Sequence, residues 1–112
     1  MAMTGTTKAE ESSLPESATI TIRERQPDPR GEVEVTPKGG RIHFQNEDAV
    51  EYALRFWKTG MEQTSGIDIL LPAGGCVTVA IKKDDEFAYS VNVIGADGSI
   101  VANGRGGGPI KN

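Results

Sequence analysis

Apolar and polar residues alternate along most of the chain. In segment 18–25 (ATITIRER), Ile20 and Ile22 are separated by polar residues. Alternate side chains of a β-strand point to the same face of a sheet, so this period predicts strands with one buried face. The same period recurs in segments 32–36, 41–46, 51–57, 67–71, 76–82 and 87–94, and a last short strand is expected around Ile100.

Turn-forming residues separate the predicted strands. The segments QPDPRG, TPKGG, LPAGG, KKDDE and GADGS are rich in Gly, Pro and Asp, which suit tight turns. Seven or eight short strands with such connections predict an all-β fold, an antiparallel β-sandwich. Segment 46–60 also fits the 3.6-residue spacing of a helix, with Asn46 as its N-cap, so a helix is an alternative there.

The two ends of the chain differ in composition from its middle. Residues 1–17 are rich in Thr, Ser, Glu and Gly and are expected to form a disordered leader. Residues 103–112 are rich in glycine and are expected to form a flexible Gly-rich tail or a long loop. The sandwich domain is therefore predicted to span residues 18–102. We find no segment with the apolar length of a signal peptide or a membrane span, and the compartment stays open.

The length and the charge of the chain exclude several classes of protein. Its 112 residues fit one domain. A net charge of −4 and a pI near 5.0 argue against a nucleic-acid binder and against adsorption to anionic lipid. Cys76 is the only cysteine, so the chain has neither an internal disulfide nor a cysteine cluster for zinc.

Four segments resemble the cupredoxin family in their order and spacing. They are EVEVTPKGGRIHFQNED, VEYALRF, LLPAGGCVTVAI and DEFAYSV, and together they lie within residues 32–94. The resemblance implies a cupredoxin-like sandwich and suggests a periplasmic or exported protein. An immunoglobulin-like sandwich remains the alternative, because both folds share this strand spacing and turn chemistry.

The family resemblance also implies where copper ligands would lie. A type 1 copper site needs a thiolate, two imidazoles and a weak axial sulfur. Counting along the family pattern places Tyr52 at the first histidine position and Val91 at the cysteine position, and segment 93–104 contains neither His nor Met. The single cysteine, Cys76, and the single histidine, His43, lie elsewhere. We therefore expect no copper site, no other metal and no cofactor.

Candidate catalytic residues are few. Cys76 has no cationic neighbour in GGCVTV that would lower the pKa of its thiol, so we expect an inert cysteine. His43 lies between Ile42 and Phe44 and should point away from the face that they share. A nucleophilic Ser65 or Ser90 would need His43 beside it. We therefore expect that the protein is not an enzyme.

Acidic residues gather at two predicted corners of the sandwich. Carboxylate oxygens at such loops can bind calcium, so binding of a calcium-type metal or of a small ligand is an alternative function. Neither group has the spacing of an EF-hand loop, and a solvated acidic turn is the simpler interpretation. The two groups are Glu47, Asp48 and Glu51, and Asp84, Asp85 and Glu86.

Trp57 marks the strongest candidate for an interaction surface. If segment 51–57 is a strand, Trp57 lies on the opposite face from Tyr52, near Arg55 and Met61. Trp, Arg, Tyr and Met are enriched at protein interfaces, although Trp57 could instead fold under the loop that follows it. The sequence thus favours a non-catalytic, metal-free module that binds a protein partner or itself.

Overall fold

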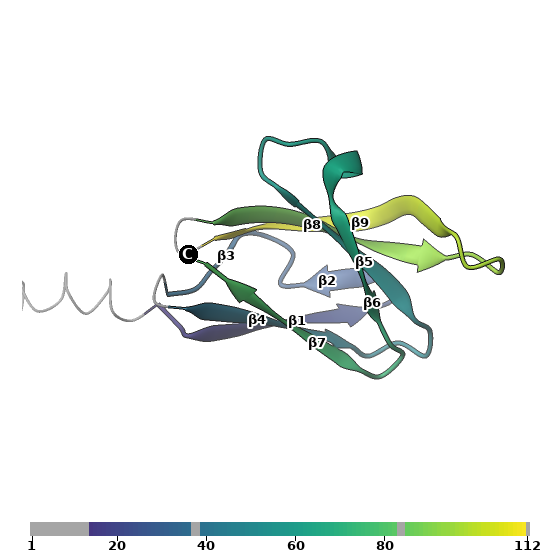
Figure 1. Ribbon diagram of the computed structural model, residues 1–112. Coiled ribbons are helices and arrows are strands. Elements are labelled where there is room, and N and C mark those ends of the chain that lie inside the picture. The colour runs from purple at the N-terminus through teal and green to yellow at the C-terminus, as the bar shows by residue number, and fades with distance from the viewer. Residues whose placement is uncertain (1–13, 37–38, 83–84, 112) are drawn as a thin grey trace, which may run out of the picture.

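Two β-sheets face each other and form a β-sandwich (Figure 1). The computed structural model describes residues 14–36, 39–82 and 85–111. One sheet has the strand order β2-β1-β4-β7, and the other has the order β3-β9-β8-β5-β6. The strands are β1 (Ser17–Arg23), β2 (Gln26–Asp28), β3 (Val33–Glu34), β4 (Gly40–Asn46), β5 (Tyr52–Lys58), β6 (Ile67–Leu71), β7 (Cys76–Ile81), β8 (Glu86–Ile94) and β9 (Ile100–Lys111).

The structure confirms the all-β fold and corrects its details. Both sheets are mixed, because β1 runs parallel to β4 and β3 runs parallel to β9. The expected antiparallel pairing holds for the other strand pairs, and the described residues form nine strands where seven or eight were expected. The period of a strand fixes which face it buries but not the direction of its neighbour.

The helical alternative for segment 46–60 is also wrong. Tyr52–Lys58 forms β5, which pairs with β6 on one side and β8 on the other. Within the described ranges the only helical element is the short 3-10 turn η1 (Gln63–Ser65), and no helix is long and apolar enough to cross a membrane.

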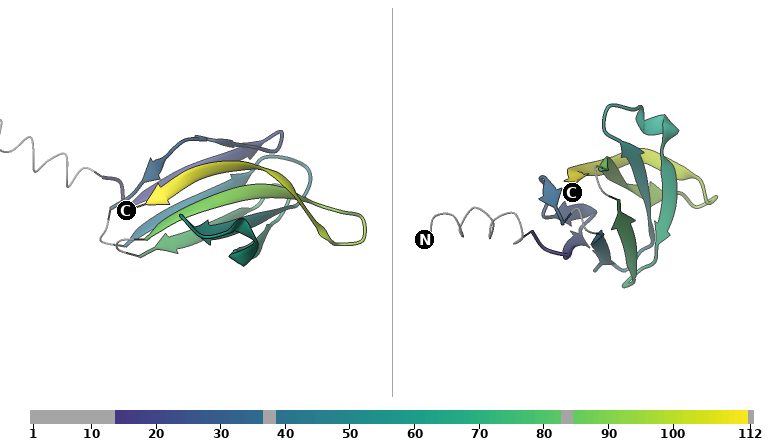
Figure 2. Two further views of the ribbon diagram at one scale, coloured as in Figure 1. Left: turned by 90° about the horizontal axis from the view of Figure 1, so that it is seen from above. Right: turned by 60° about the vertical axis from the view of Figure 1, so that its left-hand side comes forward.

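The glycine-rich segment near the C-terminus is a strand. A flexible tail or a long loop was expected for residues 103–112. Residues 103–111 instead complete β9, which pairs with β8 and β3, and residue 112 lies outside the described residues. Gly107 lies opposite Tyr89, and a Cβ atom at Gly107 would overlap the Tyr89 hydroxyl group. The glycine is thus required by the close approach of a core ring. The β8–β9 hairpin extends beyond the other strands at one end of the sandwich (Figure 2).

The core lies between the two sheets and has an aromatic centre. Phe44 of β4 makes edge-to-face contacts with Phe56 and Tyr89 of the opposite sheet, with ring centroids 5.4 and 5.2 Å apart. The predicted alternation is confirmed in β1, β4 and β5, whose inward residues are buried. The buried apolar residues include Ile20, Ile22, Val35, Ile42, Leu54, Leu71, Ile81, Val91 and Ile110.

Replacing Tyr89 with phenylalanine is expected to raise the free energy of unfolding by about 1 kcal/mol. The Tyr89 side chain is fully buried, and its hydroxyl has no hydrogen-bond partner among the described residues. Burial also raises the pKa of Tyr89 above its ordinary value. Chemical denaturation in urea would measure the change.

Tyr52 provides the matched control for this experiment. Its hydroxyl donates to Asp48 at 2.5 Å, so Tyr52→Phe should lower the free energy of unfolding by about 1.5–3 kcal/mol. Two substitutions that remove the same atom are thus expected to have opposite effects. A Tyr89→Phe variant that is less stable than the wild type would contradict the interpretation that the Tyr89 hydroxyl is buried without a hydrogen-bond partner.

Candidate functional site

The corner between β4 and β5 is organised by Asn46, which is fully buried at the end of β4. Its Nδ2 group donates to the carbonyl oxygens of Val50, Leu71 and Pro72 at 2.8, 3.3 and 3.1 Å. Its Oδ1 atom accepts a hydrogen bond from the Asp48 backbone N–H at 2.8 Å. One buried amide therefore holds the corner and the start of the β6–β7 turn in place.

Asp48 connects this corner to the β1–β2 hairpin. Its carboxylate accepts hydrogen bonds from the backbone N–H groups of Glu24 and Arg25, at 2.9 and 3.0 Å, and from the Tyr52 hydroxyl. Glu24 and Arg25 both have positive φ angles, of 52° and 67°, which non-glycine residues rarely adopt. Burial alone would raise the pKa of Asp48, but these hydrogen bonds hold it below its ordinary value.

The two positions that the family pattern assigns to copper ligands are closed to solvent. Tyr52 is 2% exposed and Val91 is fully buried. Burial, together with the hydrogen bond to Asp48, raises the pKa of Tyr52 to about 12. The Tyr52 hydroxyl is thus protonated at neutral pH and is hydrogen-bonded to Asp48. The Val91 side chain has no nitrogen, oxygen or sulfur atom that could bind a metal. These residues do not fit a type 1 copper centre.

The single histidine and the single cysteine lie on the outer face of the four-stranded sheet, which contains β4 and β7. The Nδ1 atom of His43 is 2.8 Å from the Thr78 hydroxyl oxygen, across the β4–β7 pair. Cys76 is exposed at the first residue of β7. His43 therefore points away from the core, as its place between Ile42 and Phe44 predicted. Ser90 is buried in the five-stranded sheet and Ser65 lies in η1, so the structure brings neither serine to His43.

Two of the three corner carboxylates, those of Glu47 and Asp48, have partners within the chain. Glu47 forms an ion pair with Arg23 at 2.6 Å, and Asp48 accepts the hydrogen bonds given above. Glu51 is exposed, and so is this ion pair. Of the second acidic group, Asp84 lies outside the described residues. Across the described ranges, no group of three or more His, Cys, Asp or Glu side chains is placed to hold a metal ion.

The outward face of β5 carries two of the four predicted interaction residues, Arg55 and Trp57. Arg55 donates two hydrogen bonds to the Asp68 carboxylate, at 2.8 and 3.0 Å, and Trp57 lies on the same face, half-buried and outside the core cluster. Met61, in the turn after β5, is 59% exposed. We call Arg55, Trp57, Met61, Asp68 and Leu70 the Trp57 surface.

The sequence left two alternatives for Trp57, an exposed interaction residue or a residue folded under the loop that follows it. The structure places it between the two. It is not fully exposed, and it is not part of a buried cluster. Leu70 was not singled out from the sequence, although it is 54% exposed and pairs with Ala53 beside Arg55. The signal for it was present, because Leu70 breaks the alternation of the inward residues Ile69 and Leu71.

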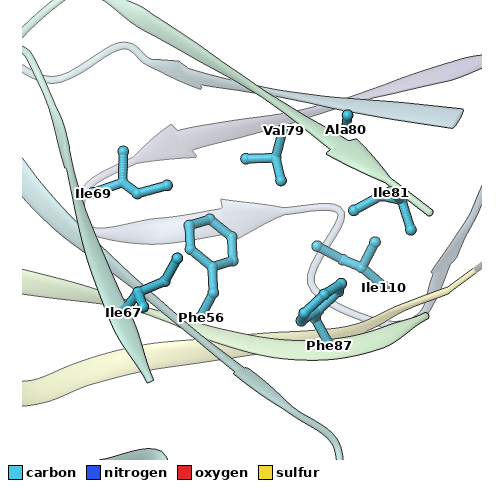
Figure 3. A pocket seen from close by; sticks show the side chains of 8 residues that line it. All are labelled: Phe56, Ile67, Ile69, Val79, Ala80, Ile81, Phe87 and Ile110. Carbon is cyan, nitrogen blue, oxygen red and sulfur yellow. The ribbon is translucent and has the colours of Figure 1, made fainter. Parts of the chain in front are cut away.

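An apolar cavity of about 220 Å³ lies between the two sheets, on the side bounded by β6 and β7 (Figure 3). The residue pattern did not predict this cavity, because its walls come from segments far apart in the chain. Ile67 lies on the inward face of β6, as the alternation predicts, but it remains 65% exposed beside this cavity. The lining residues are Phe56, Ile67, Ile69, Val79, Ala80, Ile81, Phe87 and Ile110.

The fold is similar to that of amicyanin. A reduced Cu(I) form of one amicyanin variant and the oxidised form of another each have a TM-score of 0.57 and 9% sequence identity, over 85% of this chain and 82% of theirs. A third variant, in the reduced state, has a TM-score of 0.54 and 10% identity. No family model matches the chain, and no curated protein matches its sequence. The structural likeness establishes a cupredoxin-like fold.

Proposed function

We propose that this cupredoxin-like chain is a non-catalytic module that binds a protein partner, or a second copy of itself, through the Trp57 surface. The observation that supports this proposal is the arrangement on one outward sheet face. Trp57 is half-buried there, Arg55 is held by Asp68, and Leu70 is 54% exposed. A large aromatic ring beside an ordered guanidinium and exposed apolar side chains is typical of the centre of an interface.

Rigidity of this surface favours binding. The Arg55–Asp68 ion pair joins neighbouring strands with two hydrogen bonds, and both side chains are largely shielded from solvent. Arg55 therefore loses little further rotamer freedom when a partner binds. Trp57 lies on β5, which has a paired strand on each side, so its backbone is fixed as well.

Under this proposal the chain has kept the fold of amicyanin without its copper. The buried, engaged Tyr52 and the apolar Val91 at the ligand positions support a copper-free function. Calcium binding by the acidic corners has less support, because Glu47 and Asp48 are held by Arg23 and by the β1–β2 hairpin.

Replacing Trp57 with lysine is expected to abolish binding without unfolding the protein. Sedimentation velocity over a concentration series would detect self-association, and pull-down with the immobilised full chain would detect a partner. The wild type should show a concentration-dependent mass or retain a partner, and Trp57→Lys should lose that property. Its melting temperature should stay within a few degrees of the wild type, because Trp57 is only half-buried.

Val50→Lys is the matched control. Val50 is 55% exposed and lies in the corner before β5, outside the Trp57 surface. This variant adds the same charge at an exposed apolar position and should behave as the wild type. Equal loss of binding in both variants, or equal behaviour of all three proteins, would contradict the proposal.

A further inference from the structure

The cavity lies where two consecutive strands diverge. β6 and β7 belong to opposite sheets, and the turn at residues 72–75 connects them (Figure 1). Each is an edge strand of its sheet, so no described strand closes this side of the sandwich. Leu71, next to the turn, is fully buried, whereas Ile67, at the far end of β6, is 65% exposed. The sheets are thus in contact at the turn and separate away from it.

The side chains that line the cavity are all apolar. Its eight lining residues are aliphatic or aromatic, and they come from both sheets (Figure 3). Phe56 and Phe87 form part of the wall on the five-stranded sheet, and Val79 and Ile81 face them from β7. A charged or strongly polar ligand would lose its hydration here without gaining a hydrogen bond from a lining side chain.

The volume of the cavity limits the size of its ligand. An engineered apolar cavity of roughly 150 Å³ in another protein stays dry and binds benzene. At about 220 Å³, this cavity has room for a substituted benzene ring or a short alkyl chain. Exposure of Ile67 shows that the cavity opens to solvent, so a ligand could enter without unfolding of the sandwich.

We propose that the cavity between β6 and β7 binds an uncharged apolar group, either an aromatic ring or a short alkyl chain. The lining side chains project from strands held by ladders of backbone hydrogen bonds, so the site is largely formed before the ligand arrives. The site is independent of the Trp57 surface, because Ile67 and Ile69 point inward whereas Asp68 and Leu70 alternate with them on the other face.

Titration of the full chain with toluene and with 1-octanol would test this proposal. Toluene represents a free aromatic ring, and 1-octanol represents an alkyl chain such as that of a lipid. Methyl-resolved NMR of the isoleucine residues should show saturable shifts at the lining positions with at least one probe. The methyl signals of Ile20 and Ile22, which are buried elsewhere in the core, should stay unchanged. Benzoate should bind at least tenfold more weakly than toluene because it is charged.

Two substitutions on one strand provide a matched comparison. Ile67→Trp places a larger side chain at the mouth of the cavity and should weaken binding at least tenfold. Leu70→Trp makes a similar change on the other face of β6 and should leave the affinity within twofold of the wild type. Both wild-type residues are largely exposed, so both variants should fold.

Several results would overturn the proposal. They are shifts that do not saturate, shifts that spread equally to Ile20 and Ile22, and equal affinity of the Ile67→Trp variant and the wild type. Binding of an apolar peptide to β6, with no response to either probe, would also overturn it and would assign the cavity to a partner strand. Because Trp57→Lys leaves the cavity intact, its effect on protein binding is measured separately.

Discussion

Replacing Phe44 with alanine is expected to lower the free energy of unfolding by about 3–5 kcal/mol. Phe44 is fully buried and is the point where the aromatic residues of the two sheets meet. Its ring contacts Phe56 and Tyr89 edge to face, at 5.4 and 5.2 Å between centroids. The substitution removes both the buried apolar area and these contacts, and the surrounding strands are too firmly paired to close the space.

Urea denaturation followed by circular dichroism would measure this effect, and Phe87→Ala is its control. Phe87 is only partly buried and already borders the cavity between β6 and β7. Its loss should therefore cost less than the loss of Phe44. Equal losses of stability in the two variants would contradict the interpretation that Phe44 is the centre of the core.

Replacing Asp48 with asparagine is expected to lower the free energy of unfolding by about 2–3 kcal/mol, as for loss of a hydrogen bond to a charged group. The Asp48 carboxylate accepts from three donors, namely Tyr52 and the backbone N–H groups of Glu24 and Arg25. An asparagine side chain has one acceptor oxygen and one donor group, so at least one N–H group of the hairpin would face another donor.

The contribution of Asp48 should depend on pH in a defined direction. The pKa of Asp48 in the native protein lies below its ordinary value of 3.8, so the unfolded chain takes up its proton first as the pH falls. The stabilisation is therefore fully present above the ordinary pKa and is lost as the pH falls through the native pKa. The difference in stability between the wild type and Asp48→Asn should be constant near neutral pH and shrink below about pH 4.

Tyr52 should show the opposite pH dependence. Its pKa is raised from 10.0 to about 12, so its contribution is fully present below pH 10.0 and is lost as the pH rises toward 12. Glu51→Gln is the control for both residues, because Glu51 is an exposed carboxylate in the same corner. A Glu51→Gln variant that loses as much stability as Asp48→Asn would show that the charge of the corner matters and not the hydrogen bonds of Asp48.

The corner around Asn46 and Asp48 is a hydrogen-bonded junction between the two sheets. Asn46 holds the carbonyl groups of the corner, and Asp48 joins the β1–β2 hairpin to Tyr52. Hydrogen bonds thus connect strands of both sheets here.

The sequence pattern located most of the strands, but it placed β2 in a turn and misjudged the C-terminal segment. Residues 103–111 have few apolar side chains, and composition alone favoured a tail. The structure shows that Gly107 has to be small because the Tyr89 ring packs directly over it. A glycine can be required for close packing or for backbone flexibility, and the sequence alone does not show which reason applies. Only the position of the neighbouring strand distinguishes the two.

The residue pattern by itself determined the all-β class, the inward faces of β1, β4 and β5, and the outward direction of His43. These features depend on local period and residue type, which a single chain displays directly. Only the tertiary structure decided the parallel pairing of β1 with β4, the bonds from Asp48 to a hairpin 23 and 24 residues away, and the cavity between β6 and β7. Each of these depends on which distant segments meet, and that is fixed by the packing of the two sheets and not by local sequence.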